Sequence, residues 1–164
     1  MSRYIDADAL GIGKANRDVL LYEAGGTKMK IKLDKGAFAP ERAHATDAGY
    51  DLRTPHAFYL PKGQSVVIDT GVHIQLPHGT VGMIKSKSGL NVKYGITSEG
   101  VVDEGYTGSI RAKLYNHGVE GKRFDAGDKI TQLCILPYLT PDIEIADELD
   151  PSDRGNNGFG STGI

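Results

Sequence analysis

From residue 29 onward, the chain is a series of short apolar or alternating runs separated by Gly, Pro, Asp and Asn. Such punctuation is typical of β-strands joined by tight turns. The runs cover 29–33, 50–53, 57–60, 65–68, 72–76, 81–86, 96–102, 109–116, 130–139 and 143–146. Only 88–94 interrupts the series, and there we expect one short helical turn. The pattern predicts an all-β domain of sandwich or jelly-roll type.

The size and charge of the chain exclude several classes of protein. A length of 164 residues suits one domain, and a formal charge of -2 provides no basic field for holding a DNA or RNA polymer. Monomeric nucleotides remain possible ligands. A single cysteine, Cys134, rules out an intramolecular disulfide, and we expect it to be a small core side chain. No apolar run approaches the length of a membrane span, so we expect neither a membrane segment nor a signal peptide, and a cytoplasmic location.

Three regions differ in composition. Residues 1–28 lack strand alternation and read as an N-terminal extension of unknown role. Residues 29–152 carry the β pattern. Residues 153–164 are rich in glycine, and we expect them to form a tail that is mobile without a ligand.

The segment 99–108 is the first candidate for chemistry. Its sequence predicts a β-hairpin with Asp103 and Tyr106 at or beside the tip. A hairpin offers backbone groups that can recognise the flat edge of a ligand, and a nearby carboxylate can accept a proton from water. The alternative is a solvated hairpin in which Asp103 only shapes the turn.

Two further segments are rich in hydrogen-bond donors. The segment 85–90 (KSKSGL) suits phosphate if it opens a helix, or it is a solvated basic turn. The tail combines Arg154, Phe159 and Ser161 with glycines that can wrap an anion, or it is an ordinary disordered terminus. Asp47 and Asp51 shape a turn or bind a metal ion. The histidines have no zinc-type spacing with the lone cysteine.

Five segments, taken in order, resemble the motifs of the homotrimeric dUTP pyrophosphatase (dUTPase) family. They are 47–52 (DAGYDL), 87–90 (KSGL), 100–106 (GVVDEGY), 127–133 (GDKITQL) and 154–163 (RGNNGFGSTG). Each segment is weak evidence alone, but five in the same order with suitable spacing are specific. The resemblance extends from residue 29 to residue 164.

The resemblance implies a role for each matching residue. Asp103 would deprotonate the attacking water, and Tyr106 would pack on the deoxyribose and exclude a 2′-hydroxyl. Asp51 would support Mg²⁺ through water, with the ion bound mainly to the triphosphate. The other residues that the resemblance assigns to substrate binding are Lys87, Ser88, Gly89 and Gln132 for the phosphates and water, the backbone around Val101, Val102 and Arg111 for the uracil edge, Arg154, Phe159, Gly160 and Ser161 for a closing tail, and Thr97.

Several positions depart from the family pattern. Lys87 stands where arginine is usual, so that a point charge replaces a bidentate contact with phosphate. Thr97 stands where many members carry asparagine, Asn91 where alanine is common, and Asn157 where glycine is usual. None of these changes removes the carboxylate or the aromatic ring of the third motif.

The resemblance thus implies an Mg²⁺-dependent hydrolase that converts dUTP to dUMP and pyrophosphate by attack of water on the α-phosphorus. It also implies a distorted jelly-roll or β-barrel subunit, and a homotrimer whose active sites are shared between subunits. One alternative is dCTP deaminase, which shares the fold, although its glutamate-centred motif is not evident here. Another is a non-catalytic interaction protein, in which residues 1–28 could bind the partner.

Overall fold

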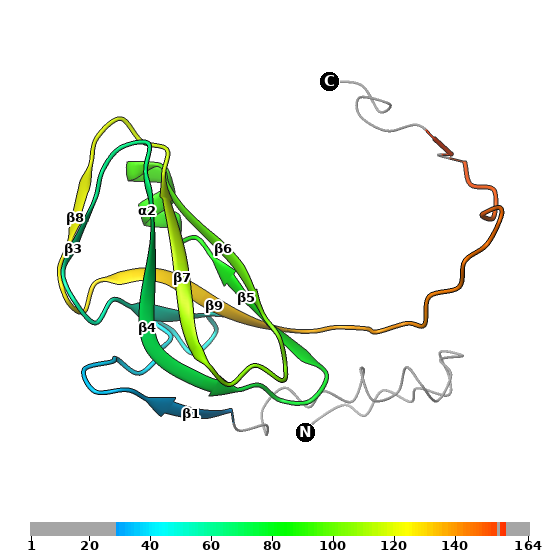
Figure 1. The fold of residues 1–164 in the computed structure, drawn as a ribbon, viewed down its shortest axis with the longest axis horizontal. Coiled ribbons are helices and arrows are strands. Elements are labelled where there is room, and N and C mark those ends of the chain that lie inside the picture. Colours follow the sequence, from blue (N-terminus) through cyan, green and yellow to red (C-terminus); the bar gives the residue numbers. More distant parts are fainter. Residues whose placement is uncertain (1–28, 154, 157–164) are drawn as a thin grey trace.

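The computed structural model describes residues 29–153, 155 and 156 of the chain. Its strands are β1 (Lys30–Leu33), β2 (Gly49–Arg53), β3 (Phe58–Leu60), β4 (Ser65–Gln75), β5 (Thr80–Lys85), β6 (Ile96–Val102), β7 (Ser109–Asn116), β8 (Lys122–Phe124) and β9 (Lys129–Pro137). One sheet has the order β1-β4-β7-β6-β5-β9-β2, and β3 pairs with β8 in a second, two-stranded sheet. The larger sheet curls into a half-barrel (Figure 1). The predicted all-β, jelly-roll-type fold is confirmed.

The predicted helical turn is also present, as helix α2 (Ser88–Tyr94). It is the only helix of the described residues. Lys87 precedes it in an extended conformation, and Gly95 ends it in the left-handed conformation with φ of 65°. Glycine adopts this conformation without the steric cost that a Cβ would bring.

One prediction about strand boundaries was wrong because a bulge was taken for a turn. The runs 65–68 and 72–76 belong to a single strand, β4, whose register against β7 shifts between Asp69 and His73. Gly71 lies inside this shift with φ of 66°, and a Cβ there would lie 2.8 Å from the Cβ of Ala37. The glycine therefore lets the strand bend against the preceding loop without ending it.

Two other strand predictions failed because pairing partners decide short strands. Strand β8 has only one apolar residue and exists through its pairing with β3, so the alternation pattern missed it. The run 143–146 was predicted to be a strand but has no strand conformation. Ile143 and Ile145 are 94% and 97% exposed, and no strand of the described residues lies beside them to complete a ladder.

The core lies on the inner side of the curled sheet and beneath the two-stranded sheet. On β7, the alternate residues Ile110, Ala112 and Leu114 are buried, while the residues between them face outward. The rings of Phe58 and Phe124 stack with centroids 4.7 Å apart and join β3 to β8. This rigid interior leaves the connecting turns and the outward faces to carry the candidate site.

Two other sequence expectations concern the burial of the single cysteine and the presence of a membrane segment. Cys134 is half-buried on β9, where the strand alternation gives the core position to Leu133 instead, so the prediction of a core cysteine was wrong. None of the helices in the described part of the chain is long and apolar enough to cross a membrane.

Candidate active site

The predicted hairpin is present, but it is paired only at its base. Strand β6 pairs with β7 at Ile96↔Asn116, Thr97↔Tyr115 and Ser98↔Leu114. Beyond these pairs β6 continues along β5, and β7 continues along β4. Toward the tip the two strands are therefore not paired with each other, so backbone groups between them can meet the flat edge of a ligand, apart from the Ser109 carbonyl, which the Tyr106 hydroxyl already engages.

The turn at the tip carries the two residues that the sequence singled out. Asp103 is exposed directly after β6, and its carbonyl accepts a hydrogen bond of 3.0 Å from the backbone N–H of Tyr106. The Tyr106 hydroxyl donates to the carbonyl of Ser109 at 2.9 Å. A Cβ at Gly108 would lie 2.5 Å from the Tyr106 hydroxyl oxygen, so the ring occupies space that only a glycine leaves open.

Glu104 anchors this turn, and the sequence reasoning missed it. Its carboxylate accepts hydrogen bonds from the backbone N–H of Gly79 at 2.8 Å and from the hydroxyl of Tyr138 at 3.2 Å, and it contacts Nδ1 of His78 at 2.8 Å. The contact with His78 and the hydrogen bond from Gly79 hold the pKa of Glu104 below its usual range. The only sign of this role in the sequence was a charged residue directly after Asp103. The partners of Glu104 lie in distant segments of the chain, so the sequence did not reveal them.

The returning side of the turn is held by a histidine on β4. The imidazole of His73 contacts the carbonyl of Thr107 at 2.9 Å through Nδ1 and the carboxylate of Asp34 at 3.1 Å through Nε2. The contact with Thr107, followed by that with Asp34, raises the pKa of His73. Both sides of the turn that presents Asp103 are therefore attached to neighbouring elements.

The lysine-rich loop (residues 85–87, KSK) leads from the end of β5 into α2, and it forms a second group of candidate residues together with the start of that helix. Ser88 and Gly89 are exposed in the first turn of the helix. Gln132, on β9, donates from Nε2 to the carbonyl of Ser86 at 2.9 Å and so holds the loop against the sheet. A Cβ at Gly49 on β2 would overlap the Gln132 side chain, so the glycine of the first motif makes room for this contact.

Asp51 is buried beneath this loop and is paired with two lysines. One carboxylate oxygen accepts a hydrogen bond from Nζ of Lys87, and the other lies 2.7 Å from Nζ of Lys129. Burial acts to raise the pKa of Asp51, but the hydrogen bonds and charges of the two lysines outweigh it and hold that pKa below its usual range. The pairing of Asp51 with Lys129 was not foreseen from the sequence.

This arrangement does not form a direct magnesium site. Both oxygens of Asp51 are engaged by ammonium groups. Nowhere in the described residues do three or more His, Cys, Asp or Glu side chains gather in a way that could hold a metal ion. Asp47 belongs to the turn before β2, where its carboxylate accepts a hydrogen bond of 2.9 Å from the backbone N–H of His44, as the turn-shaping alternative predicted.

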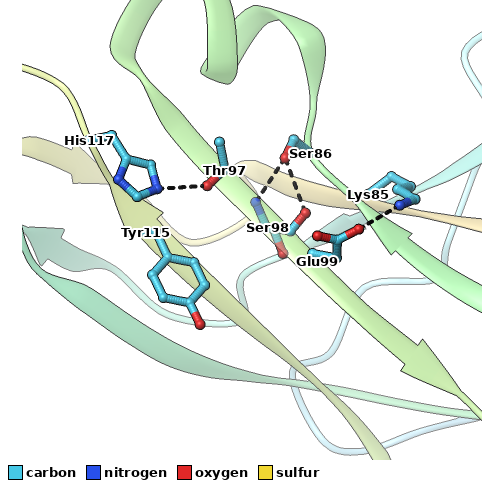
Figure 2. Close-up of a pocket in the computed structure, with 7 residues that line it drawn as sticks. All are labelled: Lys85, Ser86, Thr97, Ser98, Glu99, Tyr115 and His117. Atoms are coloured by element: carbon cyan, nitrogen blue, oxygen red, sulfur yellow. Dashed lines mark hydrogen bonds and ion pairs between the residues drawn. The ribbon is translucent and has the colours of Figure 1, made fainter. Parts of the chain in front are cut away.

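A pocket of about 720 Å³ lies between the lysine-rich loop and the paired base of the hairpin (Figure 2). In it, Nε2 of His117 lies 3.2 Å from the hydroxyl of Thr97, and Lys85 pairs with Glu99 at 2.7 Å. The residues lining the pocket are Lys85, Ser86, Thr97, Ser98, Glu99, Tyr115 and His117. The pocket is therefore walled by both charged and aromatic side chains.

The remaining predicted residues lie along the open hairpin or outside the described residues. Val101 is 61% exposed, whereas Val102 is buried. Arg111 directs its side chain to Asp69, at 3.6 Å, on the neighbouring strand. The predicted residues of the tail lie outside the described residues; they are Arg154, Phe159, Gly160 and Ser161.

The two groups of residues do not meet within one chain. The β5–β6 ladder runs from Lys85↔Glu99 at one end to Gly82↔Val102 at the other. Lys87 lies beyond the first end and Asp103 beyond the second. At about 3.3 Å per residue, Glu99 and Asp103 alone are roughly 13 Å apart along the strand. A single subunit therefore presents the carboxylate turn and the lysine-rich loop at opposite ends of the ladder.

These features define a class of protein. This all-β chain offers a hairpin whose strands are unpaired with each other toward the tip, an exposed carboxylate with an aromatic neighbour, and a lysine-bearing loop suited to phosphate. That combination is typical of a protein that binds and hydrolyses a nucleotide.

Comparison with known proteins identifies the family. Residues 35–163 match the family model for dUTPase. The chain is 42% identical over 140 residues to the deoxyuridine 5'-triphosphate nucleotidohydrolase of Clostridium acetobutylicum, covering 83% of this chain and 97% of that protein. The protein belongs to the dUTPase family.

Solved structures of phage dUTPases have the same fold. The Staphylococcus bacteriophage 80alpha dUTPase with dUPNHPP has a TM-score of 0.79 and 30% identity, covering 85% of this chain and 100% of that one. A mutant dUTPase from phage phi11 of S. aureus, in which a structural Mg(II) ion is coordinated, has a TM-score of 0.70 and 27% identity, covering 74% of this chain and 98% of that one.

Proposed function

We propose that this protein hydrolyses dUTP to dUMP and pyrophosphate. The observation that carries the proposal is the open hairpin, whose turn presents Asp103 and Tyr106 where β6 and β7 are no longer paired with each other. Membership of the dUTPase family and similarity to a phage dUTPase with dUPNHPP support the same substrate. The reaction supplies the precursor of dTTP and removes dUTP from the nucleotide pool.

In the proposed reaction, Asp103 is the general base. Its carboxylate takes a proton from water, and the water oxygen forms a bond to the α-phosphorus. The bond between the α-phosphorus and the bridging oxygen to the β-phosphate breaks, and pyrophosphate leaves with the electron pair. The exposure of Asp103 and the anchoring of its turn by Glu104 support this role, because a base must reach water and be held in place.

In the same proposal, the open part of the hairpin selects the base and the sugar. Backbone groups near Val101, Val102 and Arg111 bind the uracil edge and leave no room for the methyl group of thymine. Tyr106 packs on the deoxyribose and excludes a 2′-hydroxyl. Thr97 lies at the paired base of the hairpin and lines the pocket there, with its hydroxyl 3.2 Å from Nε2 of His117, and is proposed to contribute to substrate binding.

The lysine-rich loop binds the phosphates in this proposal, through Lys87, Ser88, Gly89 and Gln132. Mg²⁺ is proposed to arrive on the triphosphate and to offset its negative charge. Asp51 would contact the ion only through water, since both of its oxygens are engaged by lysines. The Mg(II) ion of the phage phi11 protein supports the choice of metal.

We also propose that the protein is a homotrimer whose active sites are shared between subunits. The separation of Asp103 from Lys87 along one ladder supports a site completed by another copy. The segment that follows β9 supports it as well, because it extends away from the sheet in Figure 1 and exposes large apolar side chains. These are Leu139, Ile143, Ile145 and Leu149, which are 64%, 94%, 97% and 90% exposed.

The proposal also covers the two ends of the chain and the location of the protein in the cell. Residues 153–164 are proposed to form a lid in which Arg154, Phe159, Gly160 and Ser161 close over the nucleotide. Residues 1–28 are proposed to be an extension outside the β domain of 29–152. The location is proposed to be the cytoplasm, where dUTP arises.

Pyrophosphate release from dUTP, dCTP, dTTP and UTP, measured with Mg²⁺, tests the proposed activity. Selective release from dUTP is expected. Deamination of dCTP without pyrophosphate release would indicate a dCTP deaminase instead. Inactivity toward all four nucleotides, with the protein folded and trimeric by light scattering, would favour the non-catalytic interaction protein.

A further inference from the structure

The pairing of Asp51 differs from that of the other ion pairs in the site. Its side chain is only 7% exposed, yet it has two cationic partners, Lys87 from the loop before α2 and Lys129 from the start of β9. Those two side chains are 26% and 33% exposed, so each ammonium group can also reach solvent. The cluster of Asp51, Lys87 and Lys129 has one more positive than negative charge.

The neighbouring ion pair on β2 does not cancel this excess. On the same strand, Arg53 pairs with Glu41 and also donates to the carbonyl of Gly127 at 2.8 Å. That pair is neutral and engaged. Within the cluster, two lysines thus share one carboxylate.

Because two lysines pair with the buried carboxylate of Asp51, one of them can give up its ion pair while the other keeps the carboxylate neutralised. If Lys87 were the sole partner, moving it to a phosphate oxygen would leave the buried charge of Asp51 without a counter-ion, which is strongly unfavourable. With Lys129 in place at 2.7 Å, the carboxylate keeps a counter-ion throughout. Lys87 can then exchange Asp51 for an incoming anion.

We propose that Lys129 is a positioning residue, which neutralises Asp51 so that Lys87 can move its ammonium group from Asp51 to a phosphate oxygen of the substrate. This inference rests on the proposed function in that the anion is the triphosphate of a nucleotide. Lys129 itself makes no contact with the phosphate. The lysine at position 87 suits this exchange, because a flexible ammonium group can change partners more readily than a planar guanidinium that holds two oxygens.

The test measures binding of inorganic pyrophosphate to the full chain by calorimetry, without Mg²⁺. Lys129→Met should weaken binding by at least about tenfold, since Lys87 then stays on Asp51. Lys129→Arg should bind pyrophosphate within about threefold of the parent, because arginine keeps the counter-charge. Lys62→Met, in an exposed loop, is the matched control and should bind as the parent does.

A double variant separates exchange from direct binding. Adding Asp51→Asn to Lys129→Met removes the buried charge, frees Lys87 and should restore pyrophosphate binding. Adding Glu41→Gln instead restores the same net charge without freeing Lys87, so it should not restore binding. Failure of Asp51→Asn to restore binding, or equal restoration by Glu41→Gln, would overturn the inference.

Folding and function are checked separately. If Lys129→Met does not fold, Asp51→Asn alone decides, because it should bind pyrophosphate at least as tightly as the parent and weaker binding overturns the exchange. A parent protein that fails to release pyrophosphate from dUTP would overturn the proposed function. The pyrophosphate-binding series would still decide the role of Lys129, because it does not depend on turnover.

Discussion

The carboxylate of Glu104 accepts a hydrogen bond of 2.8 Å from the backbone N–H of Gly79, which joins the turn after β6 to the turn before β5. This contact fixes the position of Asp103, the adjacent residue. Glu104→Ala should lower kcat by roughly tenfold to a hundredfold, because small displacements of the proposed general base are costly. Glu104→Gln keeps one acceptor oxygen and should lose less.

Steady-state kinetics with dUTP measures the effect of Glu104. The matched control is Glu120→Gln, an exposed glutamate in the loop after β7, which should leave kcat unchanged. A parental kcat in Glu104→Ala would show that the turn holds its shape without this anchor.

Asp103→Asn keeps the size of the side chain and removes the proton acceptor. Turnover should fall by roughly 10²-fold or more, while binding of a non-hydrolysable dUTP analogue stays near the parental affinity. Calorimetry with the analogue and steady-state pyrophosphate release measure the two effects. Near-parental hydrolysis together with normal analogue binding would assign the base to another group.

Gly108→Ala tests the packing of Tyr106. The new Cβ would lie 2.5 Å from the Tyr106 hydroxyl oxygen, so the ring must move. We expect KM for dUTP to rise by about tenfold and the preference for dUTP over UTP to fall, because the ring lines the sugar site in the proposed function.

Gly105→Ala is the control for this substitution, since a Cβ at Gly105 meets no atom within 4 Å. Both variants are compared by kcat/KM for dUTP and UTP. Equal effects of the two substitutions would indicate that the turn, and not the ring, is what alanine disturbs.

The stability of the protein should depend on pH through Asp51. The lysine pairs hold the pKa of Asp51 below its unfolded value, which is about 3.9 for aspartate. Its contribution to the free energy of unfolding is therefore complete above that value and is lost as the pH falls through the lower, folded value. Urea unfolding between about pH 6 and pH 2 should show a smaller acid-induced loss for Asp51→Asn than for the parent. Equal slopes for the two proteins would contradict the assigned pairing.

Truncation after Asp153 tests the proposed lid. The shortened chain should fold and trimerise, yet turnover should fall by at least about tenfold, because closure orders the phosphates for attack. Light scattering measures assembly, and steady-state kinetics measures turnover. Proteolysis of the full chain with and without a dUTP analogue gives a second readout, since binding should protect the tail. Equal cleavage in both states and unchanged turnover would make the tail a plain terminus.

Most of the fold could be predicted from local sequence patterns. Strand alternation is written into neighbouring residues, as in β7, where every second side chain is buried, and the helix after Lys87 was placed at its observed bounds. The failures arose where a partner decides the structure. Strand β8 needs β3, the bulge at Gly71 needs the close approach of Ala37, and the run 143–146 has no partner strand in the described chain.

For the candidate site, the sequence by itself determined which chemistry is available. A carboxylate and an aromatic ring share the turn of 103–106, and lysine and serine precede a helix, because each of these groups is a property of adjacent residues. Only the tertiary structure decided that Asp51 pairs with both Lys87 and Lys129, and that Glu104 reaches Gly79. It also set Asp103 and Lys87 at opposite ends of one ladder. These relationships join distant segments, so they depend on strand order, register and the direction each side chain takes from the sheet, which no local pattern contains.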